Sequence, residues 1–509
     1  MHLTHFLHRA LQQTPERPLT VFRDRSRTVR EVADRVARLA GGLRTLGVAE
    51  GDRIALLAAN SDRHHEVFHA AWWCGAVINP LNTRWSTAEI AYALRDADAA
   101  VLVVDDTFLS LVPALRAQCP QLRSVVHGGD EPASEDVTGY EALIEASGPV
   151  ADLRRGGGTP ALLVYTGGTT GFPKGVLHSH RGLLASLATT QLASRSVLPG
   201  GVTLVAAPLF HTAGIGGWLA QNAVGGTQVF LPGFTAEAVL AAVERHRVTT
   251  TALVPTMLQS VVEHPGICHH DLSSLYAVHY GASPMPAPVL ERAMKAFPHA
   301  GFSQGYGMTE AAGITVLGRE EHAAGGAVLR SVGRATPFCE LRIAGSDGAE
   351  QAPGDVGEVL VRGDFVMLRY WNRPEETAEA LHDGWLRTGD IGYLDANGCL
   401  HVVDRLKDMI ITGGENVYTV EVEHALARHP AVAACAVLGV PDERWGERVH
   451  AAVVLGPGAR TTLEELRAHV KTLVAGYKAP RSVEFLDALP LSGAGKVLKH
   501  ELRERAATR

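Results

Sequence analysis

A glycine- and threonine-rich stretch directly behind an apolar run is the feature that most restricts how this chain can fold. Residues 161–164 are Ala-Leu-Leu-Val, a pattern that predicts a buried strand, and residues 165–175 are Tyr-Thr-Gly-Gly-Thr-Thr-Gly-Phe-Pro-Lys-Gly. Glycines let backbone N–H groups approach an anion closely, threonines add hydroxyl donors, and Lys174 adds a positive charge. The stretch therefore predicts a loop that holds polyphosphate, with a plain surface turn as the alternative.

This loop is not a Walker A sequence, which ends in Gly-Lys-Ser/Thr, because Lys174 follows Pro173 and precedes Gly175. The stretch instead resembles the phosphate loop of the adenylate-forming superfamily, which includes acyl-CoA synthetases, luciferases and the adenylation domains of peptide synthetases. The usual form there is Tyr-Thr-Ser-Gly-Thr-Thr-Gly-x-Pro-Lys-Gly. A glycine of the Gly167-Gly168 pair replaces a hydroxyl residue but keeps its backbone donor. The resemblance implies ATP contacts from a run of loop residues: Thr166, Gly167, Gly168, Thr169, Thr170, Gly171 and Lys174.

Composition excludes several classes of protein. The chain has 509 residues, of which 46% are apolar and 20% charged, as in soluble globular proteins of more than one domain. A net charge of −7 argues against general nucleic-acid binding. Six widely spaced cysteines without a CxxC pair indicate a reducing compartment and no zinc site. With no signal-peptide pattern and no apolar stretch of about 18 residues, we expect a cytoplasmic protein without an integral membrane segment.

Alternating strand and helix patterns predict an α/β fold with a large N-terminal domain of covered, mostly parallel sheets. The clearest helix is expected over residues 28–47, where Thr28 and Glu31 form a capping-box pattern and Gly47 is a stop. A second helix is expected over 66–74, a turn over 75–80 and an exposed connection over 128–158. Strands are expected at 53–58, 99–104, 161–164, 202–206, 228–231, 250–254 and 276–280.

Beyond residue 331 the pattern changes to shorter strands, at 340–343, 357–361 and 398–403, which predict a β-rich subregion. Helices at 420–428 and 462–475, with strands at 431–437, 449–454 and 483–486, predict a small α+β domain. The resemblance implies that this domain is mobile. We therefore expect an AMP-binding domain over 1–404, a hinge over 405–408 and a C-terminal domain over 409–509.

A second motif, Gly-Tyr-Gly-Met-Thr-Glu over residues 305–310, combines an aromatic face, a hydroxyl and a carboxylate in what we expect to be a tight loop. Tyr306 could stack on adenine and Glu310 could hold Mg²⁺, although a turn with a core tyrosine is the alternative. The segment resembles the family's Tyr-Gly-x-Thr-Glu motif. The resemblance implies nucleotide contacts for Gly281, Ala282, Tyr306, Gly307, Met308 and Thr309, and a metal site that combines Thr166 with Glu310.

Four further polar positions match family motifs, although each could simply be solvated. Asp390, in an expected acidic turn, matches the carboxylate that accepts the ribose hydroxyls. Arg405 is then implied as a second ribose contact and Lys407 as the hinge. Lys496, in a Gly-rich turn near the end, matches the lysine that enters the active site for adenylation. A cation there would stabilise the charge that develops as pyrophosphate leaves.

The acyl pocket is expected along residues 211–218, 256–260, 281–283 and 308–314. These segments carry no lysine or arginine to pair with a second carboxylate, so dicarboxylic acids are disfavoured. His211 follows Pro-Leu-Phe, and the resemblance places it beside the bound carboxylate, whereas an isolated histidine is more often structural. The expected lining is His211, Ala213, Gly214, Trp218, Gly281 and Gly313, and Trp218 is the residue that could block a long tunnel.

These motifs keep the family's order from residue 165 to 499, so the resemblance spans essentially the whole chain. It implies an AMP-forming acyl-CoA synthetase that uses ATP, Mg²⁺ and coenzyme A, with Lys174, His211, Glu310 and Lys496 as catalytic residues. The predicted coenzyme A contacts, which could instead be core or surface residues, are Arg84, Gly413, Gly414, Glu415, Trp445, Tyr477 and Lys478.

The acid itself is less restricted by the sequence. The pattern favours a medium- or long-chain fatty acid, with an aryl acid of the benzoate or coumarate type as the close alternative. The sequence is also compatible with an adenylation enzyme that loads a carrier protein, and with a non-catalytic nucleotide sensor. A homodimer is left open.

Overall fold

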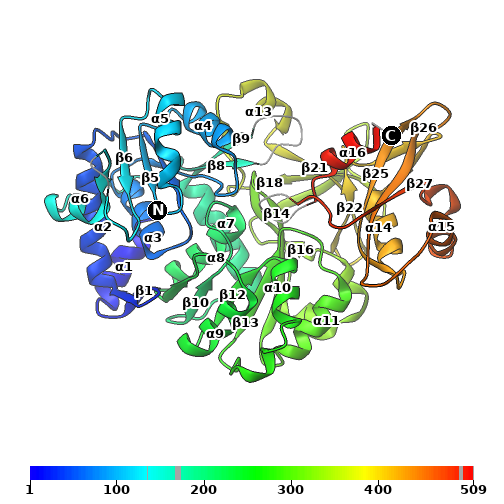
Figure 1. Cartoon of the computed structure of the whole chain (residues 1–509), viewed down its shortest axis with the longest axis horizontal. Helices are drawn as coiled ribbons and strands as arrows, with labels where there is room; N and C mark the ends of the chain where they lie inside the picture. The colour runs from blue at the N-terminus through cyan, green and yellow to red at the C-terminus, as the bar shows by residue number, and fades with distance from the viewer. Residues whose placement is uncertain (134–135, 167–172, 492–496, 508–509) are drawn as a thin grey trace. The chain divides into compact units, whose positions relative to one another are not determined.

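The computed structural model describes residues 1–133, 136–166, 173–491 and 497–507 (Figure 1). The chain divides into two compact units, Met1–Glu340 with Val361–Leu386 and Leu341–Leu360 with Arg387–Arg509. The hinge expected at 405–408 lies inside the second unit, and the domain limits drawn from the sequence stay a prediction.

A nine-stranded sheet occupies much of the first unit, in the order β16-β15-β14-β13-β12-β10-β11-β1-β2. Its central strands are parallel, and β2, β15 and β16 are antiparallel additions. The strands are β1 (Pro18–Phe22), β2 (Arg25–Thr28), β10 (Val202–Val205), β11 (Thr227–Phe230), β12 (Thr250–Leu253), β13 (Ala277–Gly281), β14 (Gly301–Met308), β15 (Ala311–Leu317) and β16 (Arg334–Ala335).

An eight-stranded sheet of the same unit has the order β19-β9-β8-β4-β3-β5-β6-β7. Its strands from β8 to β7 are parallel, while β9 pairs antiparallel with both β8 and β19. The strands are β3 (Arg53–Leu57), β4 (Val77–Pro80), β5 (Val101–Val104), β6 (Ser124–His127), β7 (Thr138–Gly139), β8 (Pro160–Thr166), β9 (Lys174–Ser179) and β19 (Arg369–Tyr370).

Helices cover both sheets, which explains why their central strands are continuous apolar runs. Successive residues of β3 point to opposite faces, so Leu56 joins the core that contains α3 and α8 while Leu57 joins the core on the α4–α5 side. Figure 1 shows α9, α10 and α11 along the nine-stranded sheet, where a third core lies. The helices of this unit are α1 (His5–Gln13), α2 (Val29–Thr45), α3 (Asp62–Trp73), α4 (Thr87–Asp96), α5 (Val112–Gln118), α6 (Tyr140–Ala146), α7 (His180–Ser194), α8 (Thr212–Ala223), α9 (Ala236–His246), α10 (Pro255–Val262), α11 (Ala287–Ala296), α12 (Arg319–Ala324) and α13 (Pro374–Ala380), with the 3₁₀ turns η1 (Leu109–Leu111), η2 (Ile267–His269) and η3 (Gly326–Arg330).

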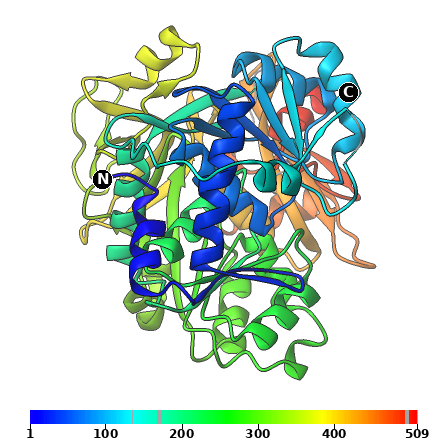
Figure 2. The same ribbon diagram turned by 90° about the vertical axis from the view of Figure 1, so that its left-hand side faces the viewer.

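The helix expected over 28–47 is confirmed as α2, which lies beside α1 (Figure 2). The Thr28 side chain accepts from the backbone N–H of Glu31, and the Glu31 carboxylate accepts from the backbone N–H of Thr28. This reciprocal pair satisfies donors that a helix start otherwise leaves unpaired.

Two connections expected from the sequence are wrong in part. The turn over 75–80 contains the buried strand β4, because Gly75 precedes the strand and Pro80 is its last residue. The exposed connection over 128–158 contains β7 and the helix α6, whose residues Tyr140, Leu143 and Ile144 are buried. The Tyr140 hydroxyl donates to Glu66 at 2.8 Å, so the phenol keeps a hydrogen bond inside the core.

The expected α/β class and the β-rich subregion are confirmed. The subregion is a sheet of order β17-β18-β21-β20, with β22 also paired to β21. A further sheet, β24-β23-β26-β25 with β27 beside β26, forms the expected C-terminal α+β arrangement. The elements are β17 (Glu340–Ala344), β18 (Gly357–Arg362), β20 (Leu381–His382), β21 (Trp385–Leu394), β22 (Leu400–Arg405), β23 (Ile410–Thr412), β24 (Glu415–Val417), α14 (Thr419–Ala427), β25 (Val432–Asp442), β26 (Gly446–Leu455), α15 (Leu463–Lys471), η4 (Gly476–Lys478), β27 (Ser482–Leu486) and α16 (Lys499–Ala507).

None of the helices within the described ranges is both long and apolar enough to cross a membrane.

Candidate active site

The two ends of the predicted phosphate loop lie opposite each other on β8 and β9. Thr166 closes β8, Lys174 opens β9, and the Thr166 hydroxyl donates to the Lys174 carbonyl at 3.5 Å. The Lys174 ammonium forms an ion pair with Glu376 of α13 and lies 5.2 Å from the ring centre of Tyr370. The loop residues predicted to contact ATP between these ends, namely Gly167, Gly168, Thr169, Thr170 and Gly171, lie outside the described residues.

Glu310 lies in the turn between β14 and β15, and only 8% of it is exposed. Its Oε1 accepts a hydrogen bond from the Tyr370 hydroxyl at 2.7 Å, and its carbonyl accepts from the Met367 N–H at 2.7 Å. Tyr370 belongs to β19, which pairs with β9 and so brings the tyrosine to the Lys174 end of that strand. The strand pairing thus gathers Lys174, Glu310, Tyr370 and Glu376 into one cluster.

This cluster fits a cation that arrives with the nucleotide. Across the described ranges, no group of three or more His, Cys, Asp and Glu side chains could hold a metal ion by itself. Mg²⁺ is usually held by one or two carboxylates together with substrate phosphates and water. The single carboxylate of Glu310, oriented by Tyr370, therefore suits Mg²⁺ that is bound as the ATP complex, and the hydroxyl of Thr166 would be the second oxygen ligand.

The Tyr306 motif is on a strand rather than in the expected loop. Tyr306 lies on β14 opposite Thr315 of β15, and the register shifts between Tyr306 and Met308. A Cβ on Gly307 would lie 2.8 Å from the Ala311 carbonyl oxygen, so the glycine lets the two backbones stay paired through this irregularity. Only Thr309 and Glu310 form the turn.

Gly281 and Ala282 lie beside this motif, because Gly281 closes β13 and pairs with Gly305 of β14. A Cβ on Gly281 would lie 2.3 Å from the Gly305 carbonyl oxygen. Ala282 has a φ of +69°, a left-handed conformation that residues with a side chain seldom adopt. In α/β sheets, ligands bind outside the carboxyl ends of parallel strands, and these predicted nucleotide contacts lie at that edge.

A small cavity of about 20 Å³ lies between β9, α7, α8 and β15. Helix α8 contributes four residues at the spacing of one helix face. None of the six residues predicted for the acyl pocket lies on the described lining. Two of them are sequence neighbours of lining residues, since His211 precedes Thr212 and Gly313 follows Ala312. The lining is His178, Gly182, Leu183, Ser186, Leu187, Thr212, Ile215, Gly216, Leu219, Ala312 and Phe365.

Trp218 has 1% of its surface exposed and is not on the described lining of the small cavity. Its place in the acyl pocket stays a prediction. Trp218 belongs to the same buried core cluster as Ile215 and Leu219, and its indole N–H donates to His65 Nδ1 at 3.3 Å. Its ring centre is 5.1 Å from that of Phe68. The aromatic cluster of α3 and α8 therefore accounts for this tryptophan.

In the second unit, Asp390 and Arg405 face each other across a strand pair. Asp390 lies on β21 opposite Arg405 of β22, and Arg405 Nε is 2.5 Å from Asp390 Oδ1. The sequence placed Asp390 in a turn, but the bend is limited to Gly389, whose φ is +68°, and the strand continues through it. The two residues predicted to contact the ribose are therefore direct neighbours.

Carboxylates on either side of the predicted hinge residue Lys407 have polar partners. Partial desolvation lowers the pKa of Lys407. Asp404 accepts hydrogen bonds from the backbone N–H and, at 3.0 Å, from the hydroxyl of Thr419, where α14 begins. Asp408 pairs with Arg503 at 2.6 Å. Lys496 lies outside the described residues.

Only some of the residues predicted to contact coenzyme A lie close to one another. Gly413 and Gly414 form the turn before Glu415 of β24, and the Gly413 N–H donates to the Trp445 carbonyl at 2.8 Å. The guanidinium groups of Arg444 and Arg481 lie 4.8 and 4.4 Å from the Trp445 ring centre, two cations that the sequence reasoning missed. Lys478 pairs with Glu421 at 2.6 Å, Tyr477 is 40% exposed, and Arg84 is an exposed residue of the first unit.

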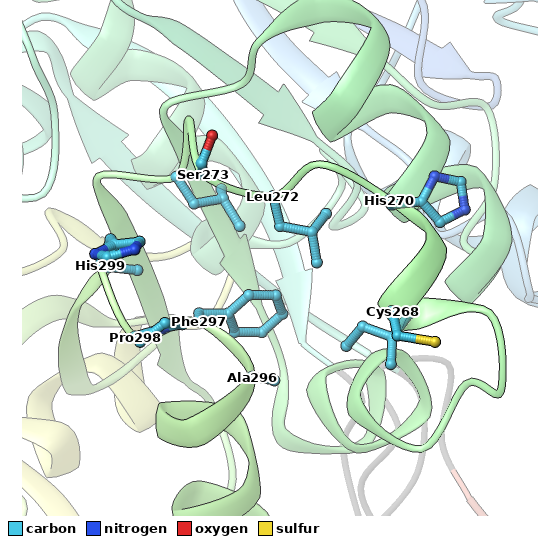
Figure 3. Close-up of a pocket in the computed structure, with 11 residues that line it drawn as sticks. Cys268, His270, Leu272, Ser273, Ala296, Phe297, Pro298 and His299 are labelled. Atoms are coloured by element: carbon cyan, nitrogen blue, oxygen red, sulfur yellow. The ribbon is translucent and has the colours of Figure 1, made fainter.

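A separate hollow of about 360 Å³ lies near the amino ends of β13 and β14 (Figure 3). The Gly281–Gly305 pair lies toward the carboxyl ends of the same strands. Leu272 and Phe297 contribute apolar surface to it, with Cys268 and His270 on one side and His299 on the other. None of the predicted site residues lines it.

Tyr370→Phe tests whether the hydrogen bond to Glu310 matters for adenylation. A hydrogen bond to a charged group contributes about 1.5–3 kcal/mol, so we expect adenylate formation, measured as pyrophosphate release, to slow by about 10- to 100-fold. Tyr140→Phe is the matched control, because it also removes a buried tyrosine–carboxylate bond but far from this cluster in the fold. Equal rates for the two variants would show that Tyr370 has only a structural role.

The covered sheets and the lysine–carboxylate cluster beside them define an α/β enzyme that handles a nucleotide. Residues 7–371 match the AMP-binding enzyme family, and residues 421–496 match the AMP-binding enzyme C-terminal domain. The chain belongs to the AMP-binding enzyme family. This membership confirms the predicted class, an AMP-forming acyl- or aryl-CoA ligase. Its substrates include ATP and coenzyme A, and Mg²⁺ is its cofactor.

Three relatives span nearly the whole chain. The feruloyl-CoA synthase of Amycolatopsis sp is 44% identical over 484 residues, which are 94% of each chain. The fatty acid–[acyl-carrier-protein] ligase ScoC of Streptomyces coeruleorubidus is 34% identical over 97% of this chain and 94% of its own. The structure of the amide bond synthetase McbA of Marinactinospora thermotolerans has a TM-score of 0.88 and 34% identity, with 99% of each chain covered.

Proposed function

We propose that the chain is an ATP-dependent aryl-CoA ligase, the alternative that the sequence placed second to a fatty-acid ligase. The observation that carries this proposal is the 44% identity to a feruloyl-CoA synthase over 94% of both chains, against 36% to a long-chain-fatty-acid–CoA ligase.

In the first step, a carboxylate oxygen of the acid attacks the α-phosphorus of ATP, and the bond to pyrophosphate breaks. Glu310 and Thr166 would hold Mg²⁺, which when bound would neutralise phosphate charge. Lys174, released from Glu376, would pair with the phosphates, while Tyr370 holds Glu310 in place as a metal ligand. Lys496 would stabilise the charge that develops on the leaving pyrophosphate.

In the second step, the thiol of coenzyme A attacks the carbonyl carbon of the acyl-adenylate, loses its proton, and AMP leaves. Rotation about Lys407 would replace Lys496 with the Gly413–Glu415 turn beside the adenylate. Arg444 and Arg481, which flank Trp445, would add positive charge for the nucleotide part of coenzyme A.

A substrate panel tests the proposal directly. The full chain is supplied with ATP, Mg²⁺ and coenzyme A together with acetate, octanoate, palmitate, benzoate, coumarate or ferulate, and thioester and AMP are quantified. We expect coumarate or ferulate to have the highest kcat/KM, at least about tenfold above palmitate. Palmitate or octanoate as the best substrate would restore the fatty-acid prediction.

The acceptor is tested with the same adenylates. Free coenzyme A, an acyl-carrier protein and a simple amine are offered in turn, and we expect thioester formation with free coenzyme A to be fastest. A preference for the carrier protein would favour the carrier-loading alternative. Absence of acid-dependent pyrophosphate release with every acid would favour a non-catalytic sensor.

A further inference from the structure

His178 is the only imidazole on the described lining of the small cavity, and it lies on β9 four residues beyond Lys174. Its neighbour Leu177 packs into the α4–α5 core, so the alternation of the strand directs His178 to the other face. Only 2% of His178 is exposed.

The hydrogen bonds of His178 fix which of its nitrogens carries a proton. Nε2 lies 2.8 Å from the carbonyl oxygen of Thr309. A carbonyl can only accept, so Nε2 carries the hydrogen. Burial lowers the pKa of His178 to about 4, and the ring is therefore neutral near pH 7. Nδ1 is then a hydrogen-bond acceptor.

The rest of the lining offers little to pair with a polar substrate group. Leu183, Leu187, Ile215, Leu219 and Phe365 are apolar. The Ser186 hydroxyl lines the cavity too, but it donates to the Ala312 carbonyl at 2.9 Å. Thr212 adds a second hydroxyl to the lining. The described lining therefore combines apolar walls with two hydroxyl groups and the neutral acceptor of His178.

The cavity volume of about 20 Å³ accommodates one water-sized group. A phenol hydroxyl has that size, and because its pKa is close to the value of about 10 for tyrosine, it is a neutral donor at pH 7. The methyl end of an alkyl chain would cover Nδ1 without giving it a partner, which is unfavourable for a buried polar atom.

We infer that His178 is a specificity-determining residue whose Nδ1 accepts a hydrogen bond from the ring hydroxyl of a phenolic acid. This inference rests on the proposed function and goes beyond it, because it names the hydroxylated subset of aryl acids and the residue that selects it. Sites built to hydrogen-bond a substrate hydroxyl reject analogues that lack it much more strongly than apolar pockets reject a change of size.

The test compares 4-hydroxycinnamate, 4-methoxycinnamate and cinnamate with the full-length enzyme. Acid-dependent exchange of pyrophosphate into ATP gives kcat/KM for each acid. For the unmodified enzyme we expect the hydroxylated acid to exceed the other two by at least about tenfold. A methoxy or unsubstituted acid that performs equally well would overturn the inference without any variant.

Variants then assign the preference to His178. His178→Phe keeps a ring but removes the acceptor, so we expect the preference to collapse to about onefold, mainly through loss of rate on the hydroxylated acid. His178→Gln keeps both a donor for Thr309 and an acceptor, and it should retain part of the preference. Ser186→Ala is the matched control from the same lining and should leave the preference unchanged.

The outcomes separate this inference from the proposed function. If no aryl acid supports exchange, both fail. If aryl acids are activated but the hydroxyl preference survives in His178→Phe, only the role of His178 is wrong. If His178→Phe does not fold, the other two variants still test the inference. It would be contradicted if His178→Gln kept the full hydroxyl preference of the unmodified enzyme while Ser186→Ala lost that preference.

Discussion

Lys496→Ala is expected to slow adenylate formation by about 100- to 1,000-fold, and thioester formation from supplied acyl-adenylate should change by less than about threefold. Removal of one group that stabilises developing charge in a transition state costs about 2.7–4 kcal/mol. Lys496 is proposed to supply such a group only while pyrophosphate leaves. In the proposed rotation, the second half-reaction would expel AMP from a different arrangement of the C-terminal residues, so it would not depend on this ammonium.

Single-turnover assays of the two half-reactions measure this effect separately. Lys499→Ala is the matched control, because the Lys499 ammonium lies 2.8 Å from Glu423 and donates to the Thr419 hydroxyl at 2.6 Å. Its loss should lower the stability of the second unit and leave the ratio of the two half-reactions unchanged. Equal loss of both half-reactions in Lys496→Ala would contradict rotation about Lys407.

The elements that the sequence predicts best are those in which one physical signal dominates. Residues 53–57 and 202–205 form parallel strands with helices on both faces, so their apolar runs are nearly continuous and visible. The start of α2 is equally clear, because Thr28 and Glu31 satisfy each other's backbone donors without help from the rest of the fold.

The predictions fail where glycine has a role other than forming a turn. Gly307 and Gly389 were expected to mark loops around Tyr306 and Asp390. In the structure they allow a close backbone approach within β14–β15 and a bend within β21. A strand neighbour that is distant in sequence decides between these uses of glycine, and a local pattern does not report that neighbour.

The candidate site was incomplete for the same reason. Glu310 and Lys174 were found through motifs, but their partners Tyr370 and Glu376 lie far along the chain, on the two-residue strand β19 and the helix α13. Only the pairing of β19 with β9 brings them together. For Trp218, the sequence suggested a place in the acyl pocket but did not report its packing against Phe68 and His65 of α3.

Glu310→Gln is expected to reduce adenylate formation at moderate Mg²⁺ concentration by about 100-fold or more. The amide still accepts a hydrogen bond from Tyr370, so the local packing is retained, but the negative charge that pairs with Mg²⁺ is lost. Loss of even a supporting partner of a metal ligand commonly costs about 10- to 100-fold in metal affinity or activity, and Glu310 is proposed as the direct ligand. Higher Mg²⁺ should therefore restore part of the rate.

Two measurements check this expectation, namely the Mg²⁺ dependence of pyrophosphate exchange and the calorimetric affinity for ATP with and without Mg²⁺. Glu376→Gln is the matched control, since it neutralises the neighbouring carboxylate that pairs with Lys174. Because this change frees Lys174 for phosphate, ATP should bind as well or more tightly, and the Mg²⁺ dependence should stay as in the unmodified enzyme. If Glu310→Gln retains the unmodified Mg²⁺ dependence, Glu310 is not a metal ligand. The Tyr370 bond would then serve only to hold β19 against the turn between β14 and β15.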